Sequence, residues 1–293
     1  MVSVIVPTYR RERPLRDILG DLAAQQYEPF EVVVVDQTER PAEETRAFVA
    51  SLGDRVRYIR RETPNLPAAR NAGIREARGE IIVFVDDDAR VRPDFLAAHA
   101  RNYTDPAIMA VAGSVLGERM SRTSTLPREA GDPLLRTFCG CWQYDRRMEV
   151  VHAPGGNHSF RREVAERAGF FDESFAGPGF REETDFFMRV SAAGLRIVYD
   201  PECWIIHPPQ PSDGGCWAGF DGVPSAARFA NHGYFILKNF PRRHWPRLFL
   251  HSFRATFFRR ETLRHPSRNF RRLARFASGW REAWRRARRR RDG

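Results

Sequence analysis

Residues 79–95 of this 293-residue chain read GEIIVFVDDDARVRPDF. The apolar run from Ile81 to Val85 follows a glycine and predicts a strand that is buried on both faces in a parallel sheet. Three consecutive carboxylates, Asp86, Asp87 and Asp88, end the strand. Ligands of open α/β sheets bind beyond the carboxyl ends of the strands, and carboxylate oxygens are preferred ligands of Mg²⁺ and Mn²⁺. The stretch therefore predicts a cation site at the sheet edge, with a solvated acidic turn as the alternative.

Short apolar strands alternate with amphipathic helices on both sides of this stretch. A first strand at residues 2–6 is followed by a helix in which Leu15, Ile18, Leu19 and Leu22 recur at helical spacing. This rhythm predicts an α/β fold, with a Rossmann-like, mostly parallel sheet flanked by helices. Further strands are expected at residues 31–35, 56–59, 196–199 and 203–206, and helices from Pro67, at residues 162–168 with Gly169 as the cap, and from Phe180.

Charge is distributed unevenly along the chain. The formal net charge is +11, but residues 226–293 hold 20 Lys and Arg against 3 Asp and Glu, whereas the first 225 residues hold 28 against 34. The basic character therefore belongs to the C-terminal region. Four cysteines (Cys139, Cys141, Cys203 and Cys216) lack zinc-ligand spacing and are expected to be free thiols. The chain shows no signal peptide and no run of 18 apolar residues, so we expect a cytoplasmic protein.

Six motifs follow one another in a fixed order: VSVIVPTY (residues 2–9), VVVVD (32–36), ARNAGI (69–74), FVDDD (84–88), GGN (155–157) and EETDF (182–186). In this order they resemble the inverting glycosyltransferase family 2, which has the GT-A fold. The resemblance covers residues 1 to about 207. It implies a metal-dependent enzyme that moves a sugar, with inversion, from a nucleotide-sugar to a hydroxyl group of a glycan, a lipid-linked acceptor or a cell-surface polysaccharide precursor.

The resemblance also implies which residues bind the donor. Asp88 should ligate the Mg²⁺ or Mn²⁺ ion directly, Asp86 the ribose or a metal-bound water, and Asp87 can share this load. His207 matches a histidine near the metal or the diphosphate. Asp36 matches the acid that accepts a hydrogen bond from the base, which favours a UDP-sugar because uracil offers an N–H donor. The loop at Pro7, Thr8 and Tyr9 is expected to line the base, and the pair Arg70 and Asn71 to lie near the base and ribose.

The catalytic base is expected at the start of a helix. The family places an aspartate there, and the matching residue here is Glu183, preceded by Glu182, with Asp185 as the alternative base. Acids in a first helical turn are also favoured by the helix dipole alone. The turn at Gly155, Gly156 and Asn157 is expected to face the sugar and the acceptor, with a tight turn of positive φ as a further reason for the glycines. Two tryptophans, Trp142 and Trp217, are candidates for sugar stacking or for the core.

The C-terminal region suggests a membrane contact. Apolar residues recur there at helical spacing (Phe270, Leu273, Ala277, Trp280 and Trp284), and arginines occupy the remaining surface. A basic helix with tryptophan on its apolar side is typical of peptides that lie in an anionic membrane interface, here the inner face of the cell membrane. A solvated basic tail is the alternative, and nucleic-acid binding is not expected because no such motif accompanies the arginines.

These patterns predict a catalytic domain at residues 1–225, with a nucleotide-sugar half at about 1–113 and an acceptor half at about 114–225, followed by a basic helical region at 226–293. Two other functions remain open. A nucleotidyltransferase would need a glycine-rich phosphate loop after the first strand, which Pro7-Thr8-Tyr9-Arg10 lacks. A non-enzymatic module that binds anionic surfaces would lose its activity on deletion of residues 264–293, whereas an enzyme is expected to keep turnover.

Overall fold

The computed structural model describes residues 1–117, 119–139, 142–177, 179–208, 224–258 and 266–292. The chain forms two compact units. The first comprises Met1–Phe171 and Phe186–Pro209, and the second comprises Asp172–Asp185 and the described residues after Gln210. The segment Asp172–Asp185, which contains the predicted catalytic base, is therefore grouped with the C-terminal helices.

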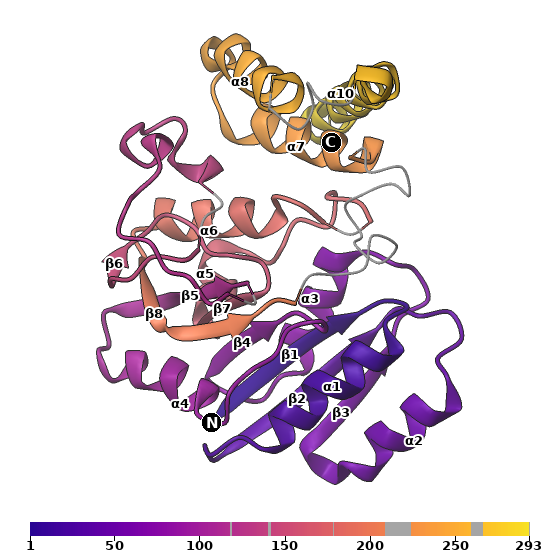
Figure 1. Ribbon diagram of the computed structural model, residues 1–293, viewed down its shortest axis with the longest axis vertical. Helices are drawn as coiled ribbons and strands as arrows, with labels where there is room; N and C mark the ends of the chain where they lie inside the picture. Colours follow the sequence, from indigo (N-terminus) through magenta and orange to yellow (C-terminus); the bar gives the residue numbers. More distant parts are fainter. Residues whose placement is uncertain (118, 140–141, 178, 209–223, 259–265, 293) are drawn as a thin grey trace. The chain divides into compact units, whose positions relative to one another are not determined.

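The first unit is built on one eight-stranded sheet (Figure 1). Its strand order is β3-β2-β1-β4-β7-β5-β8-β6. The first four strands in this order are parallel, whereas β7 runs antiparallel to β4 and β5. The predicted mostly parallel α/β sheet is confirmed. The strands are β1 (Val2–Thr8), β2 (Phe30–Asp36), β3 (Val56–Arg60), β4 (Ile81–Val85), β5 (Ile108–Leu116), β6 (Met148–Glu149), β7 (Asn157–Arg161) and β8 (Arg196–Ile206).

Both faces of the central strands are apolar and covered. In β1, Ile5 packs with Phe84 and Phe160 on one face, and Val4 packs with Leu15 on the other. This arrangement explains why these strands appear as continuous apolar runs. The two strands expected at residues 196–206 are one strand, β8, whose register against β5 shifts between Gly113 and Ser114. The helices of this unit are α1 (Glu12–Ala23), α2 (Glu43–Ser51), α3 (Leu66–Glu76), α4 (Phe95–Ala100) and α5 (Glu163–Ala168), together with most of α6 (Glu182–Ala192).

Helix ends follow the expected local signals. Asn65 caps α3 by accepting a hydrogen bond from the backbone N–H of Ala68 at 2.9 Å, and Pro67 lies in the first turn. Gly169 follows α5 with a φ of 78°, which confirms the predicted glycine cap. The first turn of α6 carries the three acids Glu182, Glu183 and Asp185.

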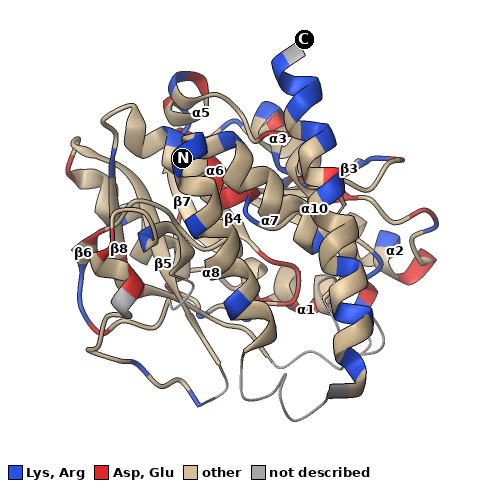
Figure 2. Cartoon of the chain, turned by 90° about the horizontal axis from the view of Figure 1, so that it is seen from above, with Lys and Arg blue, Asp and Glu red and all other residues tan. Residues whose placement is uncertain are grey.

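The second unit is helical. It contains α7 (Ala226–Asn239), α8 (Trp245–Phe257) and α10 (Asn269–Asp292), and arginines run along α10 (Figure 2). Helices α7 and α10 approach closely through small residues: a Cβ atom on Gly279 would lie 2.5 Å from the Cβ of Phe229. The face of α10 that is buried holds Phe276, Trp280, Ala283 and Ala287. None of the helices among the described residues is long and apolar enough to cross a membrane.

The predicted apolar stripe of α10 needs correction. Trp280 is only 9% exposed and packs inside the unit, whereas Phe270 is 81%, Leu273 49% and Trp284 43% exposed. Of the five residues in the predicted stripe, Trp280 belongs to the buried face, which otherwise holds Phe276, Ala283 and Ala287. Cys203 is a buried free thiol, as expected, and Cys139 is half-buried. Trp142 packs against His152 and Tyr199 in the first unit. Trp217, Cys141 and Cys216 lie outside the described residues.

Candidate functional site

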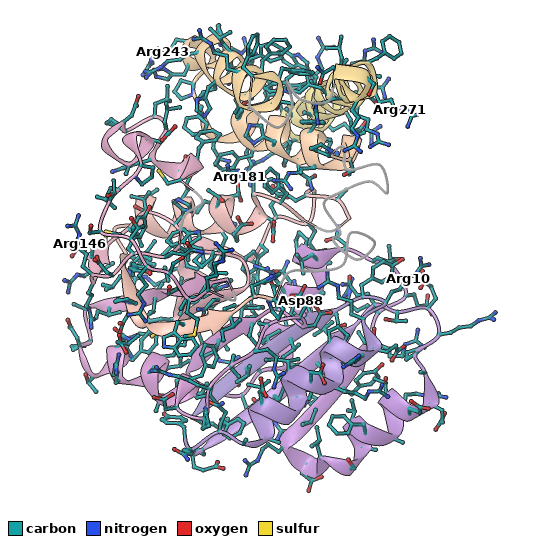
Figure 3. All side chains as sticks on the ribbon, viewed as in Figure 1. Arg10, Asp88, Arg146, Arg181, Arg243 and Arg271 are labelled. Atoms are coloured by element: carbon teal, nitrogen blue, oxygen red, sulfur yellow. The ribbon has the colours of Figure 1, made fainter. Side chains whose placement is uncertain are left out.

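The acidic triplet lies at the carboxyl edge of the sheet. Asp86 follows β4 directly, and the neighbouring β1 ends at Thr8, whose hydroxyl donates a hydrogen bond to Asp87 Oδ2 at 2.6 Å. Thr8 is also paired in register with Asp36, the last residue of β2. Three parallel strands thus bring the triplet, Thr8 and Asp36 to one edge, where ligands of such sheets bind (Figure 3 labels Asp88).

Three side chains at this edge form a candidate metal centre. Asp86, Asp88 and His207 each offer one ligand atom, and these atoms lie within 4.8 Å of one another. His207 follows β8 and is held by its backbone N–H, which donates to Leu116 O at 2.8 Å. Its Nε2 lies 3.1 Å from Asp88 Oδ1. Ligands about 2.1 Å from one ion lie up to about 4.2 Å apart, so the set fits Mg²⁺ or Mn²⁺ after a small contraction.

The electrostatics of the triplet favour a bound cation. Burial and the charge of Asp88 raise the pKa of Asp86, and burial raises the pKa of Asp87 to about 7 although Arg11 opposes the change. Burial would also raise the pKa of Asp88, but hydrogen bonds from His207 and Arg11 outweigh it and lower that pKa. The bond to Asp88 raises the pKa of His207 to about 9. Burial thus opposes ionisation of Asp86 and Asp87, and the charge of a bound cation would act against this effect.

Arg11 is a site residue that the sequence analysis missed. Its Nη1 lies 3.3 Å from Asp87 Oδ1 and forms an ion pair with Asp88 Oδ2. The residue immediately precedes α1, where the helix dipole disfavours a cation. The sequence does not single out Arg11, because Arg10 and Arg13 stand beside it and pair with Glu39 and Asp17 instead.

The residues predicted to contact the nucleotide base have defined partners. Asp36 is buried, and its carboxylate accepts hydrogen bonds from the backbone N–H of Thr38 at 2.7 Å and from the hydroxyl of Tyr58. Burial and this bond raise the pKa of Tyr58. Tyr9 is 37% exposed and donates to Glu39 at 3.0 Å, so its ring is a surface group and not part of the core. Pro7 is buried within β1.

Arg70 and Asn71 project from α3. The Arg70 guanidinium lies 5.4 Å from the ring centroids of both Phe84 and Phe171, and its Nη2 donates to Gly155 O at 3.0 Å. Asn71 is buried and exchanges two hydrogen bonds of 2.9 Å with the backbone of Phe171. The structure gives Asn71 a part in holding Phe171, and its predicted role near the ribose stays a prediction.

The glycine turn is shaped by Asp86. A Cβ atom on Gly156 would lie 2.1 Å from Asp86 Oδ2, so only glycine leaves room for this carboxylate. Gly155 and Gly156 do not have positive φ, so the expected turn geometry does not explain them. At position 156, the reason for glycine is the close approach of the Asp86 carboxylate. Asn157 does not suit the predicted sugar-facing role. Its side chain is fully buried, and its Nδ2 donates to Ser114 O and Cys203 O, each at 2.8 Å.

The helix-start acids belong to the second unit. Glu182 is buried and accepts a hydrogen bond of 2.6 Å from the backbone N–H of Phe180. Phe180 and Arg181 have φ values of 90° and 71°, a strained conformation of the kind that clusters at functional sites. Asp185 is fully buried, and its carboxylate is bound by Lys238 at 2.7 Å and Asn239 at 2.9 Å. Glu183 is half-buried and accepts a hydrogen bond of 2.9 Å from Thr184 Oγ1.

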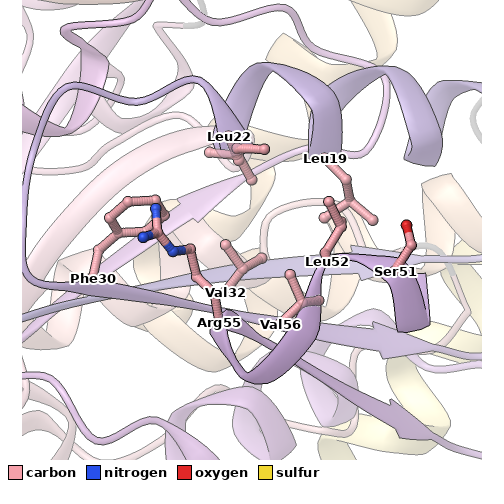
Figure 4. Close-up of a pocket in the computed structure, with 9 residues that line it drawn as sticks. Leu19, Leu22, Phe30, Val32, Ser51, Leu52, Arg55 and Val56 are labelled. Carbon is pink, nitrogen blue, oxygen red and sulfur yellow. The ribbon is translucent and has the colours of Figure 1, made fainter. Parts of the chain in front are cut away.

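A cavity of about 420 Å³ lies elsewhere in the first unit (Figure 4). It is lined mainly by apolar side chains from α1, α2 and the beginnings of β2 and β3, with Arg55 beside Phe30. These residues lie at the amino ends of the strands, opposite the edge that carries the acids. The cavity is therefore separate from the candidate metal centre.

Comparison with known proteins identifies the family. The family described as glycosyl transferase family 2 matches residues 3–169. Among curated proteins, the chain is 27% identical over 219 residues to the glucosyl-dolichyl phosphate glucuronosyltransferase of Haloferax volcanii, covering 70% of this chain and 68% of that protein. It is 28% identical over 219 residues to the succinoglycan biosynthesis protein ExoM of Rhizobium meliloti, covering 72% and 68%.

Solved structures share the fold. GalNAc-T7 with UDP, GalNAc and Mn²⁺ superposes with a TM-score of 0.62 at 15% identity, over 80% of this chain and 48% of that one. TarS 1–349 of S. aureus in complex with UDP-GlcNAc gives a TM-score of 0.57 at 18% identity, over 84% and 70%. The chain thus spans about half the length of the first of these proteins. Because the family match covers more than half of the chain, and the sheet has the GT-A architecture that the six motifs predicted, the protein belongs to glycosyl transferase family 2.

Proposed function

We propose that this protein is a metal-dependent, inverting glycosyltransferase that moves a sugar from a nucleotide-sugar, favouring UDP, to a hydroxyl group. The observation that carries the proposal is the set of Asp86, Asp88 and His207 at the carboxyl edge of the sheet. Family 2 membership and the Mn²⁺, UDP and UDP-GlcNAc named for structures of the same fold support it. The nucleotidyltransferase alternative still lacks a glycine-rich phosphate loop after β1.

Each side chain of the metal centre has a role in donor binding. Asp88, Asp86 and His207 hold Mg²⁺ or Mn²⁺, which, when bound, supplies positive charge that stabilises the departing diphosphate. Arg11 is already positioned on Asp87 and Asp88, and Arg70 fixes the carbonyl of Gly155 beside the turn that accommodates Asp86. Asp36, at the end of β2, is proposed to accept a hydrogen bond from the base through a lone pair not used by Thr38 or Tyr58.

Glu183 is the proposed catalytic base. Inversion requires a group that takes the proton of the acceptor hydroxyl during direct displacement at the anomeric carbon. Of the two candidates, Asp185 is fully buried and bound by Lys238 and Asn239. The Asp185 carboxylate is therefore held by two side chains of α7, whereas Glu183 stands at the position that matches the family's catalytic acid, which favours Glu183.

Two variants test the proposal. Asp88→Ala should abolish the Mn²⁺-dependent part of UDP binding in calorimetry, and Asp54→Ala, at an exposed position before β3, serves as the acidic control. Glu183→Gln should retain UDP binding but lose transfer, measured as nucleoside diphosphate release from UDP-glucose, UDP-GlcNAc and GDP-mannose. If UDP binding by Asp88→Ala responds to Mn²⁺ as wild-type binding does, the metal assignment is contradicted. Wild-type turnover by Glu183→Gln would move the base to Asp185.

The acceptor is proposed to be a lipid-linked or polysaccharide precursor, reached at the anionic inner face of the membrane. Two relatives, named as a glucosyl-dolichyl phosphate glucuronosyltransferase and a succinoglycan biosynthesis protein, support this class. The second unit exposes Phe258 by 66% and Phe270 by 81% in a region with 20 basic and 3 acidic residues. Flotation with phosphatidylglycerol vesicles should be lost in Phe270→Ser/Leu273→Ser, and Leu126→Ser is the matched control. Equal flotation of all three proteins would contradict the membrane contact.

A further inference from the structure

The segment that carries the proposed base is fastened to helix α7. Asp172 lies at the beginning of this segment and Asp185 at its end, and both accept hydrogen bonds from Lys238 Nζ, at 2.6 Å and 2.7 Å. Asn239 adds a bond of 2.9 Å to Asp185, and Tyr234 adds one of 3.0 Å to Asp172. One lysine thus ties together the two ends of residues 172–185.

The middle of the segment is held by Asn231 of α7. Its amide accepts a hydrogen bond of 3.2 Å from Ala176 N–H and donates to Ala176 O at 3.0 Å and to Gly179 O. Asn231 is fully buried and is itself bound by Arg286 of α10 at 2.9 Å. The backbone immediately before the strained residues Phe180 and Arg181 is therefore fixed by side chains of the C-terminal helices.

Lys238 is a charged side chain that is buried between two carboxylates. The side chains of Lys238 and Asp185 are 6% and 0% exposed. Lys238 holds the pKa of Asp172 at about 2, although burial acts in the opposite direction. A buried cation is costly unless it is fully paired, and here it bridges two carboxylates that are 13 positions apart in the chain. Such an arrangement fixes geometry better than a surface ion pair does.

We infer that Lys238 and Asn231 are positioning residues, through which the C-terminal helices set the geometry of Glu183. The inference rests on the proposed function, because it takes Glu183 as the base. It gives α7 a role in catalysis without contact with the reacting atoms. It also changes the expectation that turnover survives deletion of residues 264–293, because α10 packs on α7 and binds Asn231 through Arg286.

The main test compares Lys238→Met with Lys238→Arg in the full chain. A displacement of about 1 Å at a reacting group can cost up to about 100-fold in rate, so Lys238→Met should lower kcat by about 10- to 100-fold. The affinity for UDP with Mn²⁺ should stay within about twofold of wild type, since the metal-binding residues lie in the other unit. Lys238→Arg keeps a cation that reaches two carboxylates and should transfer faster than Lys238→Met.

A second, milder variant distinguishes loss of positioning from loss of folding. Asn239→Ala removes the hydrogen bond that this amide donates to the Asp185 carboxylate and should lower kcat by about 3- to 10-fold, with unchanged UDP affinity, in a protein that melts cooperatively. Leu248→Ala, a buried residue of α8, is the control for general loss of stability, and it should keep wild-type kcat below its melting temperature.

The outcomes separate this inference from the proposed function. If Glu183→Gln loses turnover but Lys238→Met and Asn239→Ala keep wild-type kcat, the positioning role is refuted and the base assignment stands. Loss of kcat in Leu248→Ala as large as that in Lys238→Met would likewise refute positioning in favour of general stability. If Glu183→Gln keeps turnover, the base assignment itself fails.

Discussion

Gly156 provides a sharp test of the metal centre, because its missing side chain makes room for Asp86. In Gly156→Ala, the new Cβ atom would lie 2.1 Å from Asp86 Oδ2 and 2.6 Å from Asp86 Cγ, whereas real contacts of this kind are essentially never under 3.0 Å. The backbone is held by the bond from Asp86 N–H to Gly156 O. The carboxylate must therefore retreat by about 1 Å, roughly five times the tolerance of about 0.2 Å for a metal–ligand distance.

The predicted result is a large loss of metal affinity with little loss of stability. Rotating one carboxylate away from its preferred rotamer costs about 0.5–1.5 kcal/mol, so the melting temperature should fall by only a few degrees. Losing one of three protein ligands should weaken Mn²⁺ binding at least about 10-fold, which corresponds to about 1.4 kcal/mol. The assay is a Mn²⁺ titration followed by electron paramagnetic resonance, with and without UDP.

Gly131→Ala is the matched control, because a Cβ atom at Gly131 meets no heavy atom of the described part of the chain within 4 Å. It should bind Mn²⁺ as the wild type does. If Gly156→Ala binds Mn²⁺ within twofold of wild type, Asp86 is not a ligand and the proposed geometry of the centre is refuted. A cooperative melting curve for both variants would show that the comparison concerns folded protein.

Three further predictions concern other parts of the chain. Arg11→Gln should tighten Mn²⁺ binding about fivefold in the absence of nucleotide, because it removes a competing cation from Asp87 and Asp88; unchanged affinity would speak against competition. His99 is fully buried, and burial lowers its pKa from 6.5 to about 4, so the unfolded chain binds the proton first as pH falls. Stability should decrease from pH 6.5 towards pH 4 by up to about 3 kcal/mol relative to His99→Gln in urea titrations, and parallel pH profiles would contradict this. Gly279→Ala brings a Cβ atom within 2.6 Å of the backbone oxygen of Ala226, so we expect about 1–3 kcal/mol of destabilisation in thermal melts, and a gain in stability would contradict the α7–α10 contact.

Much of the first unit could be predicted because its signals are local. Apolar runs identified the strands, although β1 continues through Pro7 to Thr8, and spacing identified α1. Acids at the ends of β2 and β4 had to meet at one edge, because parallel strands align their carboxyl ends. Family 2 membership followed from the order of the six motifs.

Other features could not be predicted because they depend on which side chains meet in space. Asn157 matched a motif, but packing against Ser114 and Cys203 turns its amide into the core. Trp280 and Trp284 have equivalent spacing in the sequence, and the contacts of Trp280 with α7 and with Phe249 of α8 decide that it is the buried one. Periodicity identifies an apolar stripe but not the direction in which a neighbouring helix covers it.

The sequence by itself determined the α/β class, the edge at which the acids gather and the kind of ion they suit, because strand ends and carboxylates are encoded within a few consecutive residues. Only the tertiary structure decided that Arg11 pairs with Asp87 and Asp88, and that Lys238 binds Asp185 from 53 positions away. Such pairings arise when distant elements pack and desolvate charged groups, which then must find partners, and no local pattern specifies that choice.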